Sequence, residues 1–193
     1  WTKQAHISSI AYARYFIPDY IPETKVLYLD SDLIVNTSLE KLFCIDLEEK
    51  LFAAVKDTDG ITFNTGVLLI NNEKSRQEKL KERLIEQSIV TIREVEEGSF
   101  DNFNGDQTIF NQVCSNQWLE LDKEFNLQVG HDTTAFYNKW ENYFNELVTP
   151  SIIHFVSYRK PWKTLIANRY RDLWWQFHDL EWSQILQHHL GEF

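Results

Sequence analysis

The sequence predicts an α/β domain, a sheet of short strands covered by amphipathic helices. Several apolar runs that are rich in β-branched residues have the length of buried strands. Between them lie segments with apolar residues at helical spacing and polar outer faces. The 193 residues, 43% hydrophobic and 25% charged, suit one soluble globular domain with a single core. Since no internal repeat or linker is evident, we expect residues 1–193 to form one domain.

The central predicted strand lies in the run from Lys25 to Val35. Its apolar start indicates a buried strand, which ends abruptly in Asp30-Ser31-Asp32. Within a second run, Gly66 indicates a bulge or a place where another group approaches the backbone closely. The other predicted strands are 51–55, 63–71, 118–121 and 152–156.

Five helices are predicted from apolar spacing and from the residues that end them. A helix over 6–16 stops at Pro18, and another covers 106–114. The tail over 170–190 is helical and rich in aromatic residues. Such a stripe indicates core or interface packing, with association to a membrane surface as the alternative. The remaining predicted helices are 39–43 and 73–87.

Charge and cysteine content argue against several classes of function. A formal net charge of −10 disfavours a nucleic-acid partner, because phosphate backbones are bound by clustered lysines and arginines. Cys44 and Cys114 lack the spacing of a metal site and the density of a disulfide scaffold, so we expect buried free thiols in a reducing cytosol. No apolar run is long enough to predict a transmembrane helix, and the opening residues lack the pattern of a signal peptide. We therefore expect a cytoplasmic protein, at the inner face of the membrane if the aromatic tail associates with it.

Asp30 and Asp32 are the first candidates for a metal site. In an extended chain residues i and i+2 point to the same side, so the two carboxylates converge. Their mutual repulsion favours a cation between them. The alternative is an ordinary Asp-Ser-Asp turn after a strand.

A histidine and a lysine later in the chain extend this predicted site. His154 lies in an apolar strand, where a hydrogen-bonded core side chain is the alternative to a metal ligand. Two carboxylates and one imidazole suit Mn²⁺ better than they suit Mg²⁺, which we keep as the alternative. Lys160 adds a positive charge without serving as a ligand. A metal beside a lysine is what a diphosphate leaving group requires.

Four segments together resemble glycosyltransferase family 8, which includes bacterial galactosyl- and glucosyltransferases and the glycogenins. Each segment alone is unspecific, but they occur in the family's order and approximate spacing and cover nearly the whole chain. They are the run Lys25 to Val35, the run Phe63 to Asn71, the pair Asp106-Gln107, and His154 to Trp162. The resemblance implies a Rossmann-like sheet of the GT-A type that binds a nucleotide sugar.

The resemblance also implies a role for individual residues. The matching manganese ligands are Asp30, Asp32 and His154, and the lysine that contacts the diphosphate is Lys160. The residues that match the lining of the donor sugar are Arg14, Asn64, Gly66, Asp106 and Gln107, of which Asp106 and Gln107 lie at the catalytic centre. Asp57 and His6 fall near donor and acceptor positions, and we assign them to the acceptor. The alternatives are a surface charge near a helix end for Arg14 and a charge favouring a helix start for Asp106.

By this similarity, the expected reaction moves a hexose from a UDP-sugar to a glycan, glycolipid or glycoprotein with retention of anomeric configuration. The acceptor attacks from the face on which UDP leaves, and the leaving phosphate oxygen takes the acceptor's proton. Metal and Lys160 stabilise the departing UDP. Because an amide is a poor nucleophile, we assign Gln107 to stabilising the oxocarbenium-like centre.

Two departures from the family keep a second function open. Ser157 stands where the family has glycine, so its side chain either crowds the diphosphate or donates a hydrogen bond to it. The family's first strand and helix are expected before Trp1, which indicates an N-terminally incomplete domain. Both departures favour a non-catalytic domain that binds a sugar nucleotide or a partner. A haloacid-dehalogenase-type phosphatase is the lesser alternative, because Ile34 replaces the Thr or Val of that signature and no later acidic pair is evident.

Overall fold

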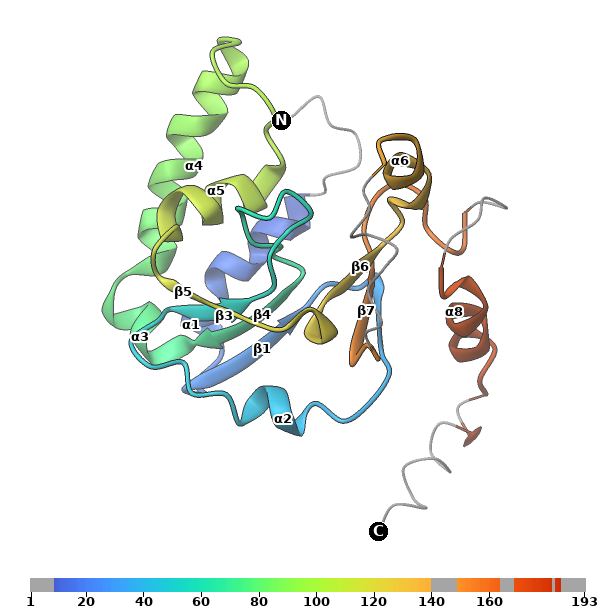
Figure 1. Ribbon diagram of the computed structural model, residues 1–193. Coiled ribbons are helices and arrows are strands. Elements are labelled where there is room, and N and C mark those ends of the chain that lie inside the picture. Colours follow the sequence, from blue (N-terminus) through green and yellow to red (C-terminus); the bar gives the residue numbers. More distant parts are fainter. Residues whose placement is uncertain (1–8, 140–148, 164–168, 182, 185–193) are drawn as a thin grey trace.

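The computed structural model describes residues 9–139, 149–163, 169–181 and 183–184, and it forms two sheets with helices around them (Figure 1). The strands are β1 (Lys25–Leu29), β2 (Leu33–Val35), β3 (Phe52–Ala54), β4 (Val67–Asn71), β5 (Trp118–Glu120), β6 (Leu127–Val129) and β7 (Ile152–Phe155). The α-helices are α1 (Ile17–Tyr20), α2 (Glu40–Phe43), α3 (Asn72–Gln77), α4 (Leu80–Glu96), α5 (Gly105–Cys114), α6 (Asp132–Tyr137) and α8 (Arg171–His178). Two 3₁₀ helices are η1 (Ser9–Phe16) and η2 (Lys123–Phe125). The predicted α/β class is confirmed.

The larger sheet has four strands in the order β1-β4-β3-β5. Strand β4 runs antiparallel to both neighbours, whereas β3 and β5 pair in parallel. The end of β1 and the start of β4 therefore lie at the same edge of the sheet. There the backbone N–H of Asp30 donates to the carbonyl oxygen of Gly66 at 2.8 Å.

Alternation along the central strands gives this sheet two apolar faces. On β4, Leu68 and Ile70 point into one cluster, and Val67 and Leu69 point into another. Helices α4 and α5 cover the first face (Figure 1). On the second face, Leu42 of α2 packs beside the strands. Full burial of a side chain of this size contributes about 1.5–3 kcal/mol, so both faces stabilise the sheet.

The smaller sheet has the order β2-β7-β6, with β7 antiparallel to β2 and parallel to β6. Ile152 of β7 belongs to the second apolar cluster of the larger sheet, so the two sheets share packing. Helix α8 lies beside β7 (Figure 1), where Leu173 and Trp174 pack against the apolar residues of this sheet.

The run from Lys25 to Val35 contains the expected strand before Asp30, but that strand is half-buried and a second short strand follows the aspartates. Strand β1 belongs to the larger sheet and β2 to the smaller one, and a bend over 30–32 carries the chain between them. The side chains of β1 are half-buried, because in the described part of the chain this strand pairs with β4 alone. The two aspartates therefore lie where the chain leaves one sheet for the other.

Three helix and strand boundaries also differ from expectation. The helix predicted to stop at Pro18 is a 3₁₀ helix, η1, and α1 follows it directly. Pro18 lies in the first turn of α1, where a backbone N–H would have no intrahelical partner. The predicted helix over 73–87 is two helices, because Lys79 takes a left-handed conformation with φ 51°, and the second continues to Glu96. Gly66 precedes β4 and is not inside it.

The aromatic tail lies partly within the described residues. The helix of this tail is present as α8, whereas Trp182 and residues 185–193 lie outside the described residues. The rings of Trp162 and Trp174 lie 5.1 Å apart, and Trp174 stacks on His178. Cys44 and Cys114 are free thiols, but only Cys114 is buried as expected, because Cys44 is exposed. Among the described helices, none has the length and apolarity needed to cross a membrane.

Candidate functional site

Two carboxylates and one imidazole meet where the two sheets adjoin. Nε2 of His154 lies 3.2 Å from Oδ1 of Asp32 and 3.8 Å from Oδ2 of Asp30. One ligand atom from each of the three residues lies within 4.8 Å of the others. The aspartates converge as expected, but through the bend over 30–32 and not through extended backbone.

Strand pairing brings His154 to the aspartates. In the antiparallel register of β2 and β7, His154 lies opposite Leu33, and the backbone N–H of Phe155 donates to the carbonyl of Asp32 at 2.9 Å. The imidazole packs against the backbone of Gly66. A Cβ added at Gly66 would lie 2.1 Å from Cε1 of His154, so only glycine leaves room for this ring.

Lys160 supplies a positive charge beside this carboxylate pair. Its ammonium group contacts both Oδ2 of Asp32 and the carbonyl oxygen of Phe155. Burial raises the pKa of Asp32, but the hydrogen bonds and charges of His154 and Lys160 outweigh it and hold that pKa well below its usual range. The Asp32 carboxylate is therefore ionised at neutral pH and available to a cation.

The donor set fits a divalent transition metal. Two carboxylates and one imidazole nitrogen are ligands that Mn²⁺ accepts. Both aspartate side chains are about a quarter exposed, which leaves a path for an incoming ion, whereas the His154 side chain is 4% exposed. The other ring nitrogen of His154, Nδ1, is 3.0 Å from Oδ1 of Asn126 and is therefore not free to bind.

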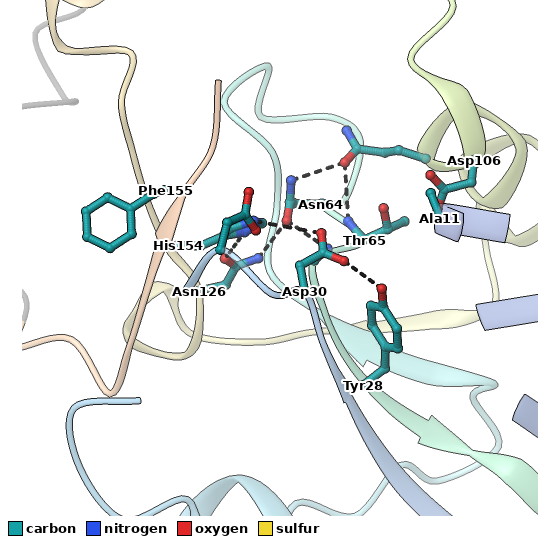
Figure 2. Close-up of polar contacts among 12 residues, drawn as sticks. Ala11, Tyr28, Asp30, Asn64, Thr65, Asp106, Asn126, His154 and Phe155 are labelled. Carbon is teal, nitrogen blue, oxygen red and sulfur yellow. Dashed lines mark hydrogen bonds and ion pairs between the residues drawn. The ribbon is translucent and has the colours of Figure 1, made fainter. Parts of the chain in front are cut away.

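Arg14 is a buried link in the site and not the surface charge that was the alternative. Its side chain is 4% exposed. One terminal nitrogen donates to Oδ1 of Asp30 at 3.0 Å, another donates to the carbonyl of Thr65, and the guanidinium lies over the ring of Tyr28. Tyr28 in turn donates to Oδ1 of Asp30 at 2.7 Å (Figure 2).

Asp106 is a buried carboxyl group at the start of α5. Burial raises its pKa to about 6, the charge of Asp30 adds to this effect, and Arg14 opposes it. Nε of Arg14 lies 3.1 Å from Oδ2 of Asp106, but its hydrogen points to the carbonyl of Ala11. Oδ2 of Asp106 is therefore buried without a hydrogen bond, although an ion pair lies next to it.

Gln107 is held in one orientation by three hydrogen bonds. Its Oε1 accepts from Nδ2 of Asn64 at 3.1 Å and from the backbone N–H of Thr65 at 3.3 Å. Its Nε2 donates to Oδ2 of Asp57. The half-buried carboxylate of Asp57 thus accepts from Gln107, next to the turn over 57–60 in which Gly60 takes φ 71°.

Ser157 uses its hydroxyl group within the loop that follows β7. The hydroxyl donates to the carbonyl of Gly130 at 2.9 Å and accepts from the backbone N–H of Arg159 at 3.2 Å. Its backbone has φ 77°, the left-handed region that glycine adopts more easily. The hydroxyl proton is therefore committed to Gly130 in this geometry and not directed at a diphosphate.

Two residues of the site were not predicted from the sequence, and one predicted residue is not among those that the structure describes. Asn126 and Tyr28 contact the metal-ligand candidates. Asn126 belongs to no motif, and Tyr28 lies in the run from Lys25 to Val35 but was given no role. Asn126 precedes β6, a strand of three residues that we did not predict. His6 lies outside the described residues.

Comparison with known proteins shows the family to which the chain is similar. The family model described as glycosyl transferase family 8 matches residues 2–165. The glycosyltransferase GlyD of Streptococcus pneumoniae serotype 4 is 76% identical over all 193 residues, which are 24% of its length. GlyE of the same organism is 40% identical over 95% of this chain, which covers 45% of GlyE. The chain thus spans less than half the length of these relatives.

Solved structures show the same architecture. The crystal structure of GlyE from Streptococcus pneumoniae superposes with a TM-score of 0.85 at 38% identity, over 99% of this chain and 47% of that one. A structure of the galactosyltransferase LgtC in complex with donor and acceptor sugar analogues gives a TM-score of 0.72 at 25% identity. That match covers 91% of this chain and 68% of LgtC.

Proposed function

The chain belongs to glycosyltransferase family 8, and we propose that it transfers a hexose from a UDP-sugar to a carbohydrate-bearing acceptor, with Mn²⁺ and with retention of configuration. The observation that supports this proposal best is the cluster of Asp30, Asp32 and His154 beside Lys160. Family membership argues against the haloacid-dehalogenase alternative. The two free thiols suit a reducing compartment, so the cytosol is the proposed location.

Two kinds of contact would hold the donor's diphosphate, one through a metal ion and one directly through Lys160. Asp30, Asp32 and His154 would hold Mn²⁺, which when bound supplies positive charge to the diphosphate oxygens. Lys160 exchanges its contact with Asp32 for one with the diphosphate and stabilises the negative charge that develops as UDP leaves. Lys160 is therefore a catalytic residue in this proposal.

The donor hexose would lie between the metal ligands and α5. Arg14 connects Asp30 to Asp106 and fixes the position of both carboxyl groups. Oδ2 of Asp106 is buried without a hydrogen bond. In this proposal, a hydroxyl group of the donor sugar would donate to it. Asn64 and Gly66 line the same edge, between the strand ends of β1 and β4.

The reaction itself is a front-face displacement. The bond between the anomeric carbon and the β-phosphate oxygen breaks while the acceptor oxygen bonds to the same carbon from the same face. The acceptor's proton passes to the leaving phosphate oxygen. Gln107, held by three hydrogen bonds, presents a fixed amide dipole to the positive charge at the anomeric carbon and does not attack it.

Calorimetric titration of UDP with and without Mn²⁺ tests the proposed donor site. We expect binding only with the metal, and loss of that binding in Asp32→Asn. Glu49→Gln removes a charge of the same kind from an exposed surface carboxylate and should leave binding unchanged. Metal-independent UDP binding, or Mn²⁺-dependent binding that survives in Asp32→Asn, would contradict the metal assignment.

Release of UDP from UDP-glucose and UDP-galactose, measured with carbohydrate acceptors present, tests the transfer step. The proposal expects release that depends on Mn²⁺ and falls by at least tenfold in Lys160→Ala. Tight UDP binding without release for either donor would identify the non-catalytic sugar-nucleotide domain instead. The hydroxyl of Ser157, which donates to Gly130 and not to a diphosphate, is the observation that keeps this second function in view.

A further inference from the structure

A line of hydrogen-bonded side chains connects a carboxylate at one end of the site to the imidazole at the other. We call it the amide relay, and it consists of Asp57, Gln107, Asn64, Asn126 and His154. Nδ2 of Asn64 donates to Oε1 of Gln107 at 3.1 Å, and Nδ2 of Asn126 donates to Oδ1 of Asn64 at 2.9 Å. Dashed lines in Figure 2 join Asn126 to both Asn64 and His154.

Every amide of the relay has a defined orientation, with its NH₂ group turned toward Asp57 and its oxygen toward His154. Neighbouring groups that can only accept or can only donate a hydrogen bond set this orientation. The ionised carboxylate of Asp57 can only accept, so Gln107 turns its Nε2 toward it and its Oε1 toward Asn64. Backbone N–H groups can only donate. Those of Thr65 and Gly66 point at Oε1 of Gln107 and at Oδ1 of Asn64, at 3.3 Å and 3.0 Å, and impose the same direction independently.

The direction is passed to the imidazole by the last amide. With Nδ2 of Asn126 donating to Asn64, its Oδ1 faces Nδ1 of His154 at 3.0 Å and can only accept. Nδ1 therefore carries the hydrogen. In the neutral ring this leaves the lone pair on Nε2, which faces Asp32 and Asp30. Asn126 is 1% exposed, so water does not compete for its bonds.

We propose that Asn126 is a positioning residue that fixes the metal-binding tautomer of His154, with Asp57 setting the direction of the relay from its far end. This inference rests on the metal site of the proposed function but not on sugar transfer. With the opposite tautomer, an Nε2–H group would point at Asp32 and form a hydrogen bond with it, leaving no lone pair for a metal. Groups that bond to the non-ligating nitrogen of a histidine ligand typically change metal affinity 10–100-fold.

Nitrogen-15 NMR of the His154 ring in the metal-free wild-type chain tests the tautomer directly. We expect Nδ1 to carry a hydrogen that it donates to Asn126, so that Nε2 is the nitrogen left to face the metal. A neutral ring with its hydrogen on Nε2 would overturn the proposal. This measurement requires neither bound metal nor a substituted residue that folds.

Two substitutions separate positioning from packing. Asn126→Leu keeps the approximate volume but removes both polar groups, so we expect mixed tautomers and a 10–100-fold loss of Mn²⁺ affinity in calorimetry. Asn126→Asp keeps an acceptor for the Nδ1 hydrogen of His154, because a carboxyl group has an accepting oxygen in either protonation state. We expect it to recover the wild-type tautomer and most of the affinity.

Gln128→Leu is the matched control for loss of a partly buried amide in the same segment. Nε2 of Gln128 donates to the carbonyl of Lys56 at 2.9 Å, outside the relay. It should lower stability without changing the tautomer or Mn²⁺ affinity. A folded Asn126→Leu variant that behaves like this control would overturn the proposal.

The outcomes also distinguish this inference from the proposed function. If the wild-type chain binds Mn²⁺ with the expected tautomer but releases no UDP, sugar transfer fails and the inference stands. If it has the expected tautomer but no Mn²⁺ affinity, the metal assignment itself fails, and with it the purpose assigned to Asn126.

Discussion

At the scale of the residue, one missing side chain decides where the imidazole can lie. The ring of His154 occupies the place that a Cβ at Gly66 would take. The backbone of Gly66 does not need a left-handed conformation, so steric exclusion is the reason for glycine here. Overpacking of this kind typically costs 1–3 kcal/mol and displaces the obstructing group.

Gly66→Ala should therefore remove Mn²⁺-dependent UDP binding and lower the free energy of unfolding by about 1–3 kcal/mol. Calorimetry and urea denaturation measure the two effects. Gly60→Ala is the matched control. Gly60 has φ 71° with nothing near its added Cβ, so strain alone should cost about 1 kcal/mol and spare binding. Equal loss of binding in both variants would contradict the steric explanation.

A second effect at this scale is the raised pKa of Asp106. A rise from 3.8 to about 6 means that the folded protein binds a proton that the unfolded chain has already released. Below pH 4 both states are protonated and no penalty exists. Between about pH 4 and pH 6 the unfolded state ionises first, so stability is lost as pH rises, by about 3 kcal/mol in total.

Asp106→Asn should remove this pH-dependent loss. The difference in unfolding free energy between variant and wild type should shift in favour of the variant by about 3 kcal/mol from pH 4 to pH 7. Urea denaturation across this range measures it. A difference that stays constant with pH would show that Asp106 titrates at its ordinary pKa in the folded protein.

At the scale of the element, the loop after β7 contains a residue with a strained backbone whose side chain also forms a hydrogen bond. Ser157 holds a left-handed backbone, which costs a non-glycine residue about 1–2 kcal/mol, while its hydroxyl anchors the loop to Gly130. A typical hydrogen bond contributes about 0.5–1.5 kcal/mol. The two terms are of similar size, so the serine is close to neutral for stability.

Substitutions at Ser157 should therefore follow an order. Ser157→Gly loses the hydrogen bond but also the strain, and should stay within about 1 kcal/mol of wild type. Ser157→Ala loses the hydrogen bond and keeps the strain, and should be less stable than both. Urea denaturation gives the ranking. An alanine variant more stable than the glycine variant would contradict this account of the loop.

At the scale of the whole molecule, the candidate metal site bridges the two sheets. Asp30 follows the last residue of β1 in the larger sheet, whereas His154 belongs to β7 in the smaller one. A cation held by both connects the sheets beyond the packing that they share around Ile152. Any ion that binds only the folded state stabilises it by mass action.

Mn²⁺ at about 100 times its dissociation constant should raise the free energy of unfolding by about 2.7 kcal/mol. Thermal or urea denaturation with and without the metal measures the rise, and a chelator should reverse it. His154→Ala should abolish the increase. The same increase in that variant would mean that the stabilising ion binds elsewhere.

Sequence alone determined the α/β class, most helices and strands, and the segments that carry the site. These features are local or periodic, such as the apolar run that ends in Asp30 and Asp32. Only the folded structure shows that the chain bends at the two aspartates as it passes from one sheet to the other. It also shows that Arg14 is buried between Asp30 and Asp106, and that Asn126 contacts His154. Such contacts depend on the direction and register of strand pairing, which brings together residues far apart in the chain. Composition and spacing along a single segment do not specify that pairing.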